Sequence, residues 1–239
     1  AGNLYAVATF GNVSSAPLEM PLKDGSSTSL AVTNNWGEDY LLVKFNKDGE
    51  ILWATSIGSK FRENGTPDVT VGEDGNPVIC GVFNAANGNL MNESEEKREF
   101  YIGEQKYLLY PEQSKESALV KLNSTDGSVM WSRYFTGTGN QEVLKVQAVS
   151  GSNAVAVTGK ANNQIIVEGS AGLSTETVTH VSGADHLFVI SFDVDGKLLW
   201  SKSASGDTSS EGKEISSDDL GNIYVSGYFN GSLNWSDNI

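Results

Sequence analysis

The sequence of 239 residues has one cysteine, two histidines and five prolines, and it lacks long apolar runs. Cys80 has no second cysteine to pair with, so an intrachain disulfide is excluded. It lies in the apolar segment VICGVF, which favours a small buried hydrophobic side chain over a reactive thiol. No apolar stretch approaches the roughly 20 residues of a membrane-spanning helix, so the sequence predicts no membrane span.

Positive charge is scarce, since 16 Lys and Arg residues face 30 Asp and Glu residues and the net charge is −14. Phosphate binding depends on basic stripes that release counterions, so we expect no nucleic-acid partner. An anionic membrane surface is disfavoured for the same reason. The chain begins at Ala1 without a recognisable targeting segment, as a mature or trimmed product would.

Helical periodicity is also lacking, because no long segment carries apolar residues at i, i+3 and i+4. Short segments of alternating polarity are instead separated by Asp-Gly and Gly-Asn turns. Gly, Ser, Thr, Asn and Asp are abundant. The sequence therefore predicts an all-β fold.

Two sequence patterns recur along the chain. The first is a strand, a turn ending in Gly and the start of a second strand up to a Trp, and it occupies Asp39–Trp53, Ser117–Trp131 and Asp185–Trp200. The second is a strand with a small residue near its end, as in GNPVICGVF and GNIYVSGYF. It occupies Gly2–Phe10, Gly75–Phe83, Ser152–Lys160 and Gly221–Phe229.

The glycine of each turn and the tryptophan after it are expected to be structural residues. A hairpin loop of about three to five residues needs one residue at positive φ, and glycine adopts that conformation without a Cβ clash. These residues are Gly49, Gly127 and Gly196 with Trp53, Trp131 and Trp200.

The segments LVKFNKDGEILW, LVKLNSTDGSVMW, VISFDVDGKLLW and GNIYVSGYF resemble the bacterial β-propeller repeats often called SBBP, which are similar in logic to NHL and PQQ-type blades. The resemblance implies an all-β, β-propeller-like array of four-stranded antiparallel blades, with the tryptophans wedged between neighbouring blades. It implies a single repeat domain, 1–239, with units of about 1–58, 59–136 and 137–204 and a partial unit 205–239. We expect a bacterial protein that is secreted, periplasmic or on the cell surface.

The predicted strands do not suffice for a closed ring. The patterns give three innermost strands, four of the second type, three of the third and three outermost, which is about three to three and a half blades. Closed propellers typically have about four to eight blades. The chain is then part of a longer propeller, or it completes a ring with a second copy, or it closes alone with strands from its insertions.

An acidic residue follows each of these tryptophans by 10 or 11 positions and precedes the next innermost strand. These residues are Glu63, Glu142 and Glu211. In a propeller they would surround one mouth of the channel, where carboxylate oxygens suit a hard cation or a polar ligand. The alternative is a recurring bond from each carboxylate to backbone N–H groups of the next blade.

The insertion Glu93–Glu116 interrupts the pattern and combines aromatic with basic residues, namely Arg98, Phe100, Tyr101, Lys106, Tyr107 and Tyr110. Exposed tyrosines with charged neighbours resemble protein or carbohydrate contact surfaces, so Arg98, Tyr101, Tyr107 and Tyr110 are candidate binding residues. The alternative is a decorating hairpin, turning at Ile102–Gln105, whose aromatic side chains pack on its own blade. A later insertion predicts two more strands, Gln164–Glu168 and Thr175–Val181.

Motifs for catalysis, cofactors or metals are lacking. Asp193–Gly196 lacks the remaining ligands of an EF-hand loop. A zinc site would need more ligands than His180 and His186, and Cys80 lies in a different unit. There is no Gly-x-Ser-x-Gly elbow and no phosphate-binding loop. We therefore expect no cofactor, no metal and no catalytic residue.

Three hypotheses about function remain, because propellers carry many unrelated activities. The first is a non-catalytic extracytoplasmic module that binds protein or glycan through its long loops. The second is an enzyme of lyase, hydrolase or quinoprotein-like type that uses the channel mouth. The third is a purely structural segment of a large surface protein.

Overall fold

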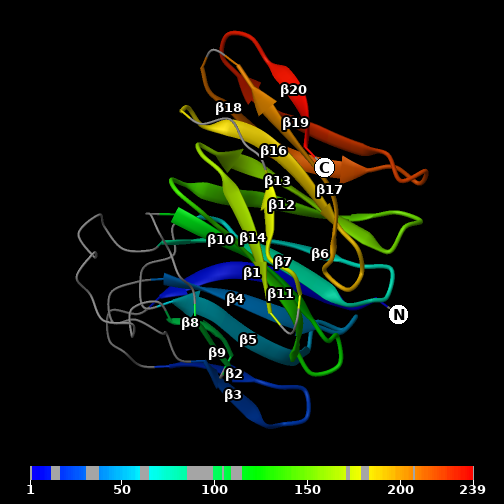
Figure 1. Ribbon diagram of the computed structural model, residues 1–239. Coiled ribbons are helices and arrows are strands. Elements are labelled where there is room, and N and C mark those ends of the chain that lie inside the picture. Colours follow the sequence, from blue (N-terminus) through cyan, green and yellow to red (C-terminus); the bar gives the residue numbers. More distant parts are fainter. Residues whose placement is uncertain are drawn as a thin grey trace, which may run out of the picture.

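A computed structural model describes residues 2–11, 17–30, 38–59, 65–84, 99–103, 105–108, 115–170, 173–178, 183–206 and 208–238. Within these residues the protein consists of strands and turns, and none of it forms a helix that could cross a membrane. The strands form three large antiparallel sheets and two strand pairs (Figure 1). The predicted all-β fold is thus confirmed.

The sheets are numbered here from the N-terminus. Sheet 1 has the order β1-β4-β5-β8-β9 and comprises Leu4–Gly11, Glu38–Phe45, Ile51–Ser59, Glu99–Ile102 and Gln105–Leu108. Sheet 2 has the order β6-β7-β10-β11-β14-β15 and comprises Asp68–Val71, Pro77–Asn84, Lys115–Leu122, Val129–Thr136, Ile165–Gly169 and Glu176–Val178.

Sheet 3 has the order β12-β13-β16-β17-β20 and comprises Gln141–Val149, Ala154–Ala161, His186–Phe192, Leu198–Ser205 and Asn234–Asn238. Sheet 4 is the pair β18 and β19, Ser210–Ser217 and Ile223–Phe229. A separate hairpin consists of β2 and β3, Leu18–Pro21 and Ser27–Leu30. All the strands of the two recurring sequence patterns are present.

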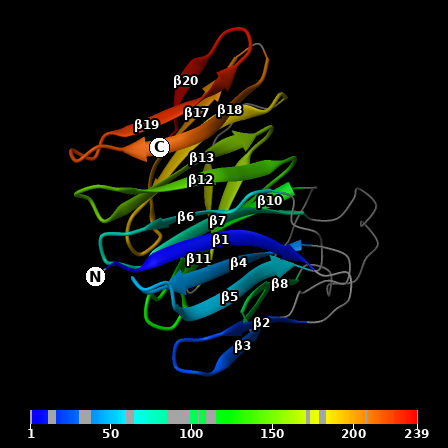
Figure 2. The same cartoon turned by 180° about the vertical axis from the view of Figure 1, so that it is seen from behind.

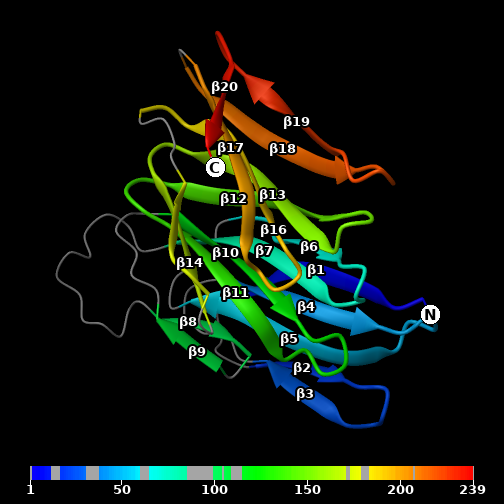
Figure 3. The same cartoon turned by 45° about the vertical axis from the view of Figure 1, so that its right-hand side comes forward.

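Sheets 1 to 4 pack face to face in chain order, which both Figure 2 and Figure 3 show. One apolar cluster joins sheets 1 and 2, a second joins sheets 2 and 3, and a third joins sheets 3 and 4. Each cluster has members from both sheets that it joins, for example Leu42 and Ile79, Leu119 and Val157, and Val189 and Ile215. A strand that is apolar on both faces can bury them in this way between two neighbouring sheets.

Strands in the insertions join the preceding sheet, which the sequence did not predict. Strands β8 and β9 follow β7 of sheet 2, yet β8 pairs with β5 of sheet 1. Strand β14 follows β13 of sheet 3 and pairs with β11 of sheet 2. Strand β20 follows β19 of sheet 4 and pairs with β17 of sheet 3. We call β8, β14 and β20 the donated strands.

The predicted insertion strands are present with shifted bounds. Strands β14 and β15 replace the expected Gln164–Glu168 and Thr175–Val181, and residues 179–181 lie outside the described part of the chain. The expected turn at Ile102–Gln105 joins β8 to β9. Phe100 on β8 is fully buried, and its ring lies 4.5 Å from that of Phe83. Phe100 is therefore buried in the core between sheets 1 and 2, and its hairpin pairs with sheet 1 rather than with its own sheet 2.

The connections differ between the two edges of the stack. At one edge, the turn edge, tight turns with a glycine at positive φ join successive strands, as at Gly49, Gly127 and Gly196. At the opposite edge, the loop edge, β1, β7 and β13 end and β4, β10 and β16 begin. The longest connections of the chain therefore start and finish at the loop edge.

Candidate functional site

Two tryptophans each join one sheet to the turn edge of the next, one between sheets 1 and 2 and the other between sheets 2 and 3. Trp53 on β5 donates a hydrogen bond from Nε1 to the carbonyl oxygen of Ser124, at 3.0 Å, in the β10–β11 turn of sheet 2. Trp131 on β11 donates in the same way to Val194, at 2.9 Å, in the β16–β17 turn of sheet 3. Both side chains are buried. We call this arrangement the tryptophan latch.

The glycine of each receiving turn lies against the tryptophan ring. A Cβ atom on Gly127 would lie 3.1 Å from Trp53, and one on Gly196 would lie 2.7 Å from Trp131. In sheet 1 the corresponding Gly49 has nothing within 4 Å of its Cβ position. Gly127 and Gly196 therefore serve both the turn and the contact between sheets, whereas Gly49 serves the turn.

Basic side chains reinforce the latches. Lys44 donates to the carbonyl oxygen of Ser124, and Lys121 donates to that of Val194 at 2.9 Å. Arg133, which is fully buried, donates from Nε to the Gly196 carbonyl oxygen at 2.5 Å. Burial lowers the pKa of Arg133, while the charges of nearby carboxylates oppose that shift. Each receiving turn thus meets a cation and an indole N–H group from the preceding sheet.

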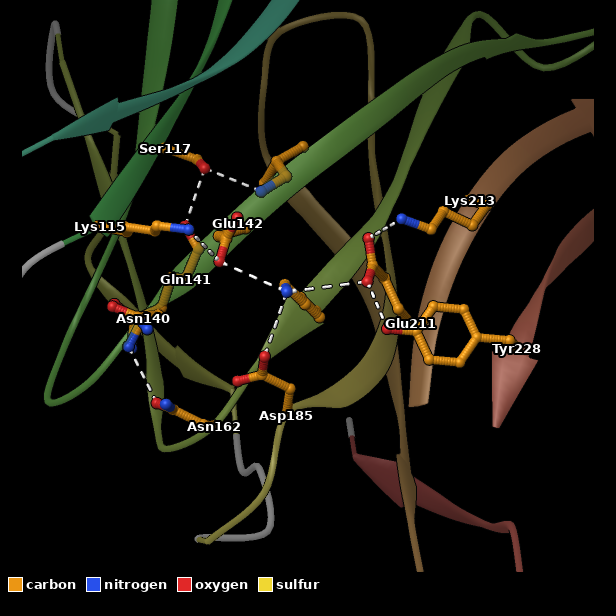
Figure 4. Close-up of polar contacts among 12 residues, drawn as sticks. Lys115, Ser117, Asn140, Gln141, Glu142, Asn162, Asp185, Glu211, Lys213 and Tyr228 are labelled. Atoms are coloured by element: carbon orange, nitrogen blue, oxygen red, sulfur yellow. Dashed lines mark hydrogen bonds and ion pairs between the residues drawn. The ribbon is translucent and has the colours of Figure 1, made fainter. Parts of the chain in front are cut away.

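A polar cluster at the loop edge links sheets 2, 3 and 4, and Figure 4 shows most of its members. We call it the Lys160 cluster, and it contains Lys115, Glu142, Lys160, Asp185, Glu211, Lys213 and Tyr228. Lys160 Nζ lies 3.7 Å from Glu142 Oε1, 3.2 Å from Asp185 Oδ2 and 3.7 Å from Glu211 Oε2. Three carboxylates from sheets 3 and 4 therefore surround one ammonium group.

Further donors flank this centre. Lys115 Nζ lies 3.1 Å from Glu142 Oε1, and Lys213 Nζ lies 2.5 Å from Glu211 Oε1. The Tyr228 hydroxyl donates to Glu211 Oε2 at 2.9 Å. Glu142 and Glu211 are 6% and 5% exposed, so their charges need these partners.

Two of the three shifted pKa values in the cluster, those of Glu211 and Lys160, illustrate the effect of this geometry. Burial opposes the ionisation of Glu211, but hydrogen bonds from Lys213 and Tyr228 and the charge of Lys160 outweigh it, so the pKa of Glu211 is lowered. Burial likewise opposes protonation of Lys160, but the surrounding carboxylates raise its pKa. The cluster is therefore a set of ion pairs at neutral pH.

A serine joins the sheets beneath the cluster. The Ser117 hydroxyl on β10 donates to the Gln141 carbonyl oxygen and accepts from the Val143 N–H group, both at 2.8 Å. Between sheets 3 and 4, the Ser210 hydroxyl accepts from the Leu187 N–H group at 3.0 Å. The first strands of sheets 3 and 4, β12 and β18, are thus each bound to the third strand of the preceding sheet, β10 and β16.

The structure brings together two of the three predicted carboxylates. Glu142 and Glu211 both contact Lys160, whereas Glu63 lies outside the described residues. In the described structure the partners of the Glu142 and Glu211 carboxylates are lysine and tyrosine side chains, whereas the alternative expected backbone N–H groups. In the described part of the chain, no three His, Cys, Asp or Glu residues form a group that could hold a metal ion.

The aromatic candidates of the long insertion are described in part. Tyr101 is half-buried on β8, next to Phe100 in the core. Tyr107 belongs to β9, for which we describe the backbone, and Arg98 and Tyr110 lie outside the described residues. Their role in binding stays a prediction.

Cys80 and His186, which the sequence also singles out, are both buried. Cys80 lies in the core between sheets 2 and 3, where burial raises the pKa of its thiol. It is thus the small buried hydrophobic residue that the sequence indicates. His186 is buried on β16, and His180 lies outside the described residues.

Sequence reasoning missed Lys160, although the sequence contains a signal for it. Counted from the glycines Gly81, Gly159 and Gly227, Lys160 occupies the position of Val82 and Tyr228 in the other second strands. The strand register places Lys160 opposite Glu142 and Tyr228 opposite Glu211. A lysine that interrupts this position, opposite a recurring glutamate, predicts an ion pair.

The chain matches no protein-family model, and no curated protein matches it. The fold and the contacts between sheets define the class by themselves. It is an all-β protein whose antiparallel sheets pack face to face and are bound to one another at both edges.

Proposed function

We propose that this chain is a β-propeller-like module of an extracytoplasmic bacterial protein and that it binds a protein or glycan through its loop edge without catalysis. The observation that carries the proposal is that the two edges of the stack have different connections. Tight turns join the strands at the turn edge, while the longest connections start and finish at the loop edge. Binding residues are concentrated on loops that a rigid scaffold positions.

The contacts between sheets support the propeller-like arrangement. In sheets 2 and 3 the strands follow chain order from β6 to β11 and from β12 to β17, as in a blade, once the donated strands are set aside. The same tryptophan latch joins sheet 1 to sheet 2 and sheet 2 to sheet 3. When the same contact recurs between successive sheets, the sheets form a regular array.

The Lys160 cluster supports a non-catalytic role. A general base needs an ionisable group that can reach a substrate proton. Glu142 and Glu211 are instead buried in ion pairs with Lys115, Lys160 and Lys213. These charges hold sheets 2, 3 and 4 together at the base of the loop edge.

A binding screen with matched variants tests the proposal. The probes are immobilised peptidoglycan, mucin glycans, plant and bacterial polysaccharides and a panel of purified extracellular proteins, each at up to about 1 mM where soluble. The loop-edge variant replaces residues 86–97 by a Gly-Ser segment of equal length and carries Tyr101→Ala. The turn-edge control carries Lys47→Ala and Asp48→Ala, which are both exposed.

We expect at least one probe to bind, with about tenfold or greater loss of affinity in the loop-edge variant and no change in the control, at unchanged melting temperature. Binding that the control loses and the loop-edge variant keeps would contradict the proposal, and so would the absence of binding to every probe.

A further inference from the structure

Trp200 is a latch residue without a receiving turn. It lies opposite Ser191, just as Trp53 lies opposite Lys44 and Trp131 opposite Lys121, so the three tryptophans are equivalent. Trp53 and Trp131 each donate to a carbonyl oxygen of the next sheet. Within the described residues, the half-buried Trp200 donates no hydrogen bond from its indole N–H group.

The sheet that follows Trp200 has an open strand. Among the described strands, β19 pairs with β18 alone, whereas the equivalent strands β7 and β13 are also paired with β10 and β16. Figure 3 shows β19 at the end of the stack. The free edge of β19 therefore corresponds to the edge that accepts the third strand in sheets 2 and 3.

Side chains on β19 are exposed where their counterparts are buried. Counted back from Gly227 and Gly159, Tyr224 corresponds to Ala156, which is fully buried between sheets 3 and 4. Tyr224 is instead 57% exposed, and Phe229, the counterpart of the fully buried Ala161, is 58% exposed. Neighbouring exposed aromatic residues are typical of a surface that another element covers.

The donated strand shows which element belongs there. The donated strands β8 and β14 are each followed in the chain by a hairpin, β10–β11 and β16–β17 respectively, which supplies the third and fourth strands of the next sheet. Strand β20 is already in its place on β17. Sheet 4 therefore lacks a third and a fourth strand among the described residues, and one hairpin of this kind would occupy the free edge of β19 and reach Trp200.

We propose that the free edge of β19 and the indole of Trp200 bind a β-hairpin of the first recurring pattern, supplied by a further unit of the same kind. Its first strand pairs antiparallel with β19. Its turn places a carbonyl oxygen on Trp200 Nε1 and a glycine against the ring, as Val194 and Gly196 do for Trp131. The inference depends on the stacking of the sheets and is independent of any ligand at the loop edge.

A second intact copy of this chain does not fit this site. The three hairpins of the required pattern, β4–β5, β10–β11 and β16–β17, are already paired with β1, β7 and β13. A second copy would have to break one of these pairings before it could lend a hairpin. The occupant is therefore an additional unit with an unpaired third strand.

An appended hairpin tests the proposal. A copy of residues 185–205 is joined to the C-terminus of the full chain by a Gly-Ser linker of about seven residues. This is the length of the connection between β15 and β16. We expect the melting temperature to rise by about 5 °C or more and the Trp200 indole proton to exchange slowly. One control carries Gly196→Leu in the appended copy alone, and the other carries Trp200→Phe in the chain with the appended copy intact.

Both controls are expected to lose most of the rise in melting temperature. An equal rise in all three proteins would overturn the proposal, because the hairpin would then not use the latch. No rise at all would overturn it too. A stable dimer of the unmodified chain with a protected Trp200 indole proton, measured by light scattering and NMR, would show that a second copy is the occupant instead.

Discussion

Gly196→Ala is expected to lower the free energy of unfolding by about 3 kcal/mol or more, whereas Gly49→Ala is expected to lower it by about 1 kcal/mol. The two glycines hold the same place in their turns, with φ of 81° and 80°. An alanine side chain is disfavoured by a similar amount at both positions because of this φ. The difference between the two decreases in unfolding free energy therefore measures the contact between the Gly196 turn and Trp131 of the neighbouring sheet.

The larger effect at Gly196 comes from the ring of Trp131. A Cβ atom there would lie 2.7 Å from the ring, closer than carbon atoms approach in folded proteins. The ring cannot move away easily, since Trp131 is 5% exposed and donates to the Val194 carbonyl oxygen. Forcing an additional methyl group into such a site typically costs about 1–3 kcal/mol.

Urea denaturation of the two alanine variants measures this difference. Combining Gly196→Ala with Trp131→Ala provides the control, because the space left by the indole would accept the new methyl group. The effects of the two substitutions are then less than additive. Equal destabilisation by Gly49→Ala and Gly196→Ala would show that the contact between Trp131 and the turn does not contribute to stability.

Lys160→Met is expected to lower the free energy of unfolding by about 2–3 kcal/mol at pH 7. The substitution keeps most of the side-chain volume and removes the ammonium group that Glu142, Asp185 and Glu211 share. Two of these carboxylates are nearly buried and would repel each other across the sheet interface. Lys213→Met is the control and should cost less than about 1 kcal/mol, because its side chain is 54% exposed.

The effect of Lys160→Met should depend on pH. In the wild-type protein the pKa of Glu211 lies below its ordinary value of 4.5. Its contribution to stability is therefore complete above that value and is lost as the pH falls through the lower pKa of the folded state. In Lys160→Met the neighbouring carboxylates repel each other at pH 7. Protonation at lower pH removes this repulsion in the folded variant, so less of its stability is lost relative to the wild-type protein.

Denaturation at pH 7, 5 and 4 measures this dependence. The difference in unfolding free energy between the wild-type protein and Lys160→Met should shrink steadily as the pH falls. A difference that stays constant across this range would mean that loss of packing, rather than of charge, explains the destabilisation.

Local features of the fold could be predicted from the sequence. Alternating polarity and the Asp-Gly turns predicted the strands, and Gly49, Gly127 and Gly196 have the expected positive φ. Trp53 and Trp131 lie between neighbouring sheets, as the resemblance to blade repeats implied. These features depend on a few consecutive residues or on one recurring position, so they can be recognised in a single sequence.

Features that depend on pairing between distant segments could not be predicted. The sequence of β8 indicates a strand, but its pairing with β5 of sheet 1 follows from how sheets 1 and 2 stack. The Lys160 cluster likewise depends on the register between β12 and β13 and on the position of sheet 4. The propeller-like arrangement, and binding at the loop edge, stay predictions.

Hydrogen exchange of the tryptophan indole protons, followed by NMR and assigned with Trp→Phe variants, tests the stacking of the sheets most directly. Trp53 and Trp131 donate to turns of the next sheet, so their indole protons should exchange slowly. Trp200 lacks such a turn in the described chain and should exchange much faster. Equal exchange at all three positions would contradict the account, because the latch would then not distinguish joined sheets from the open end of the stack.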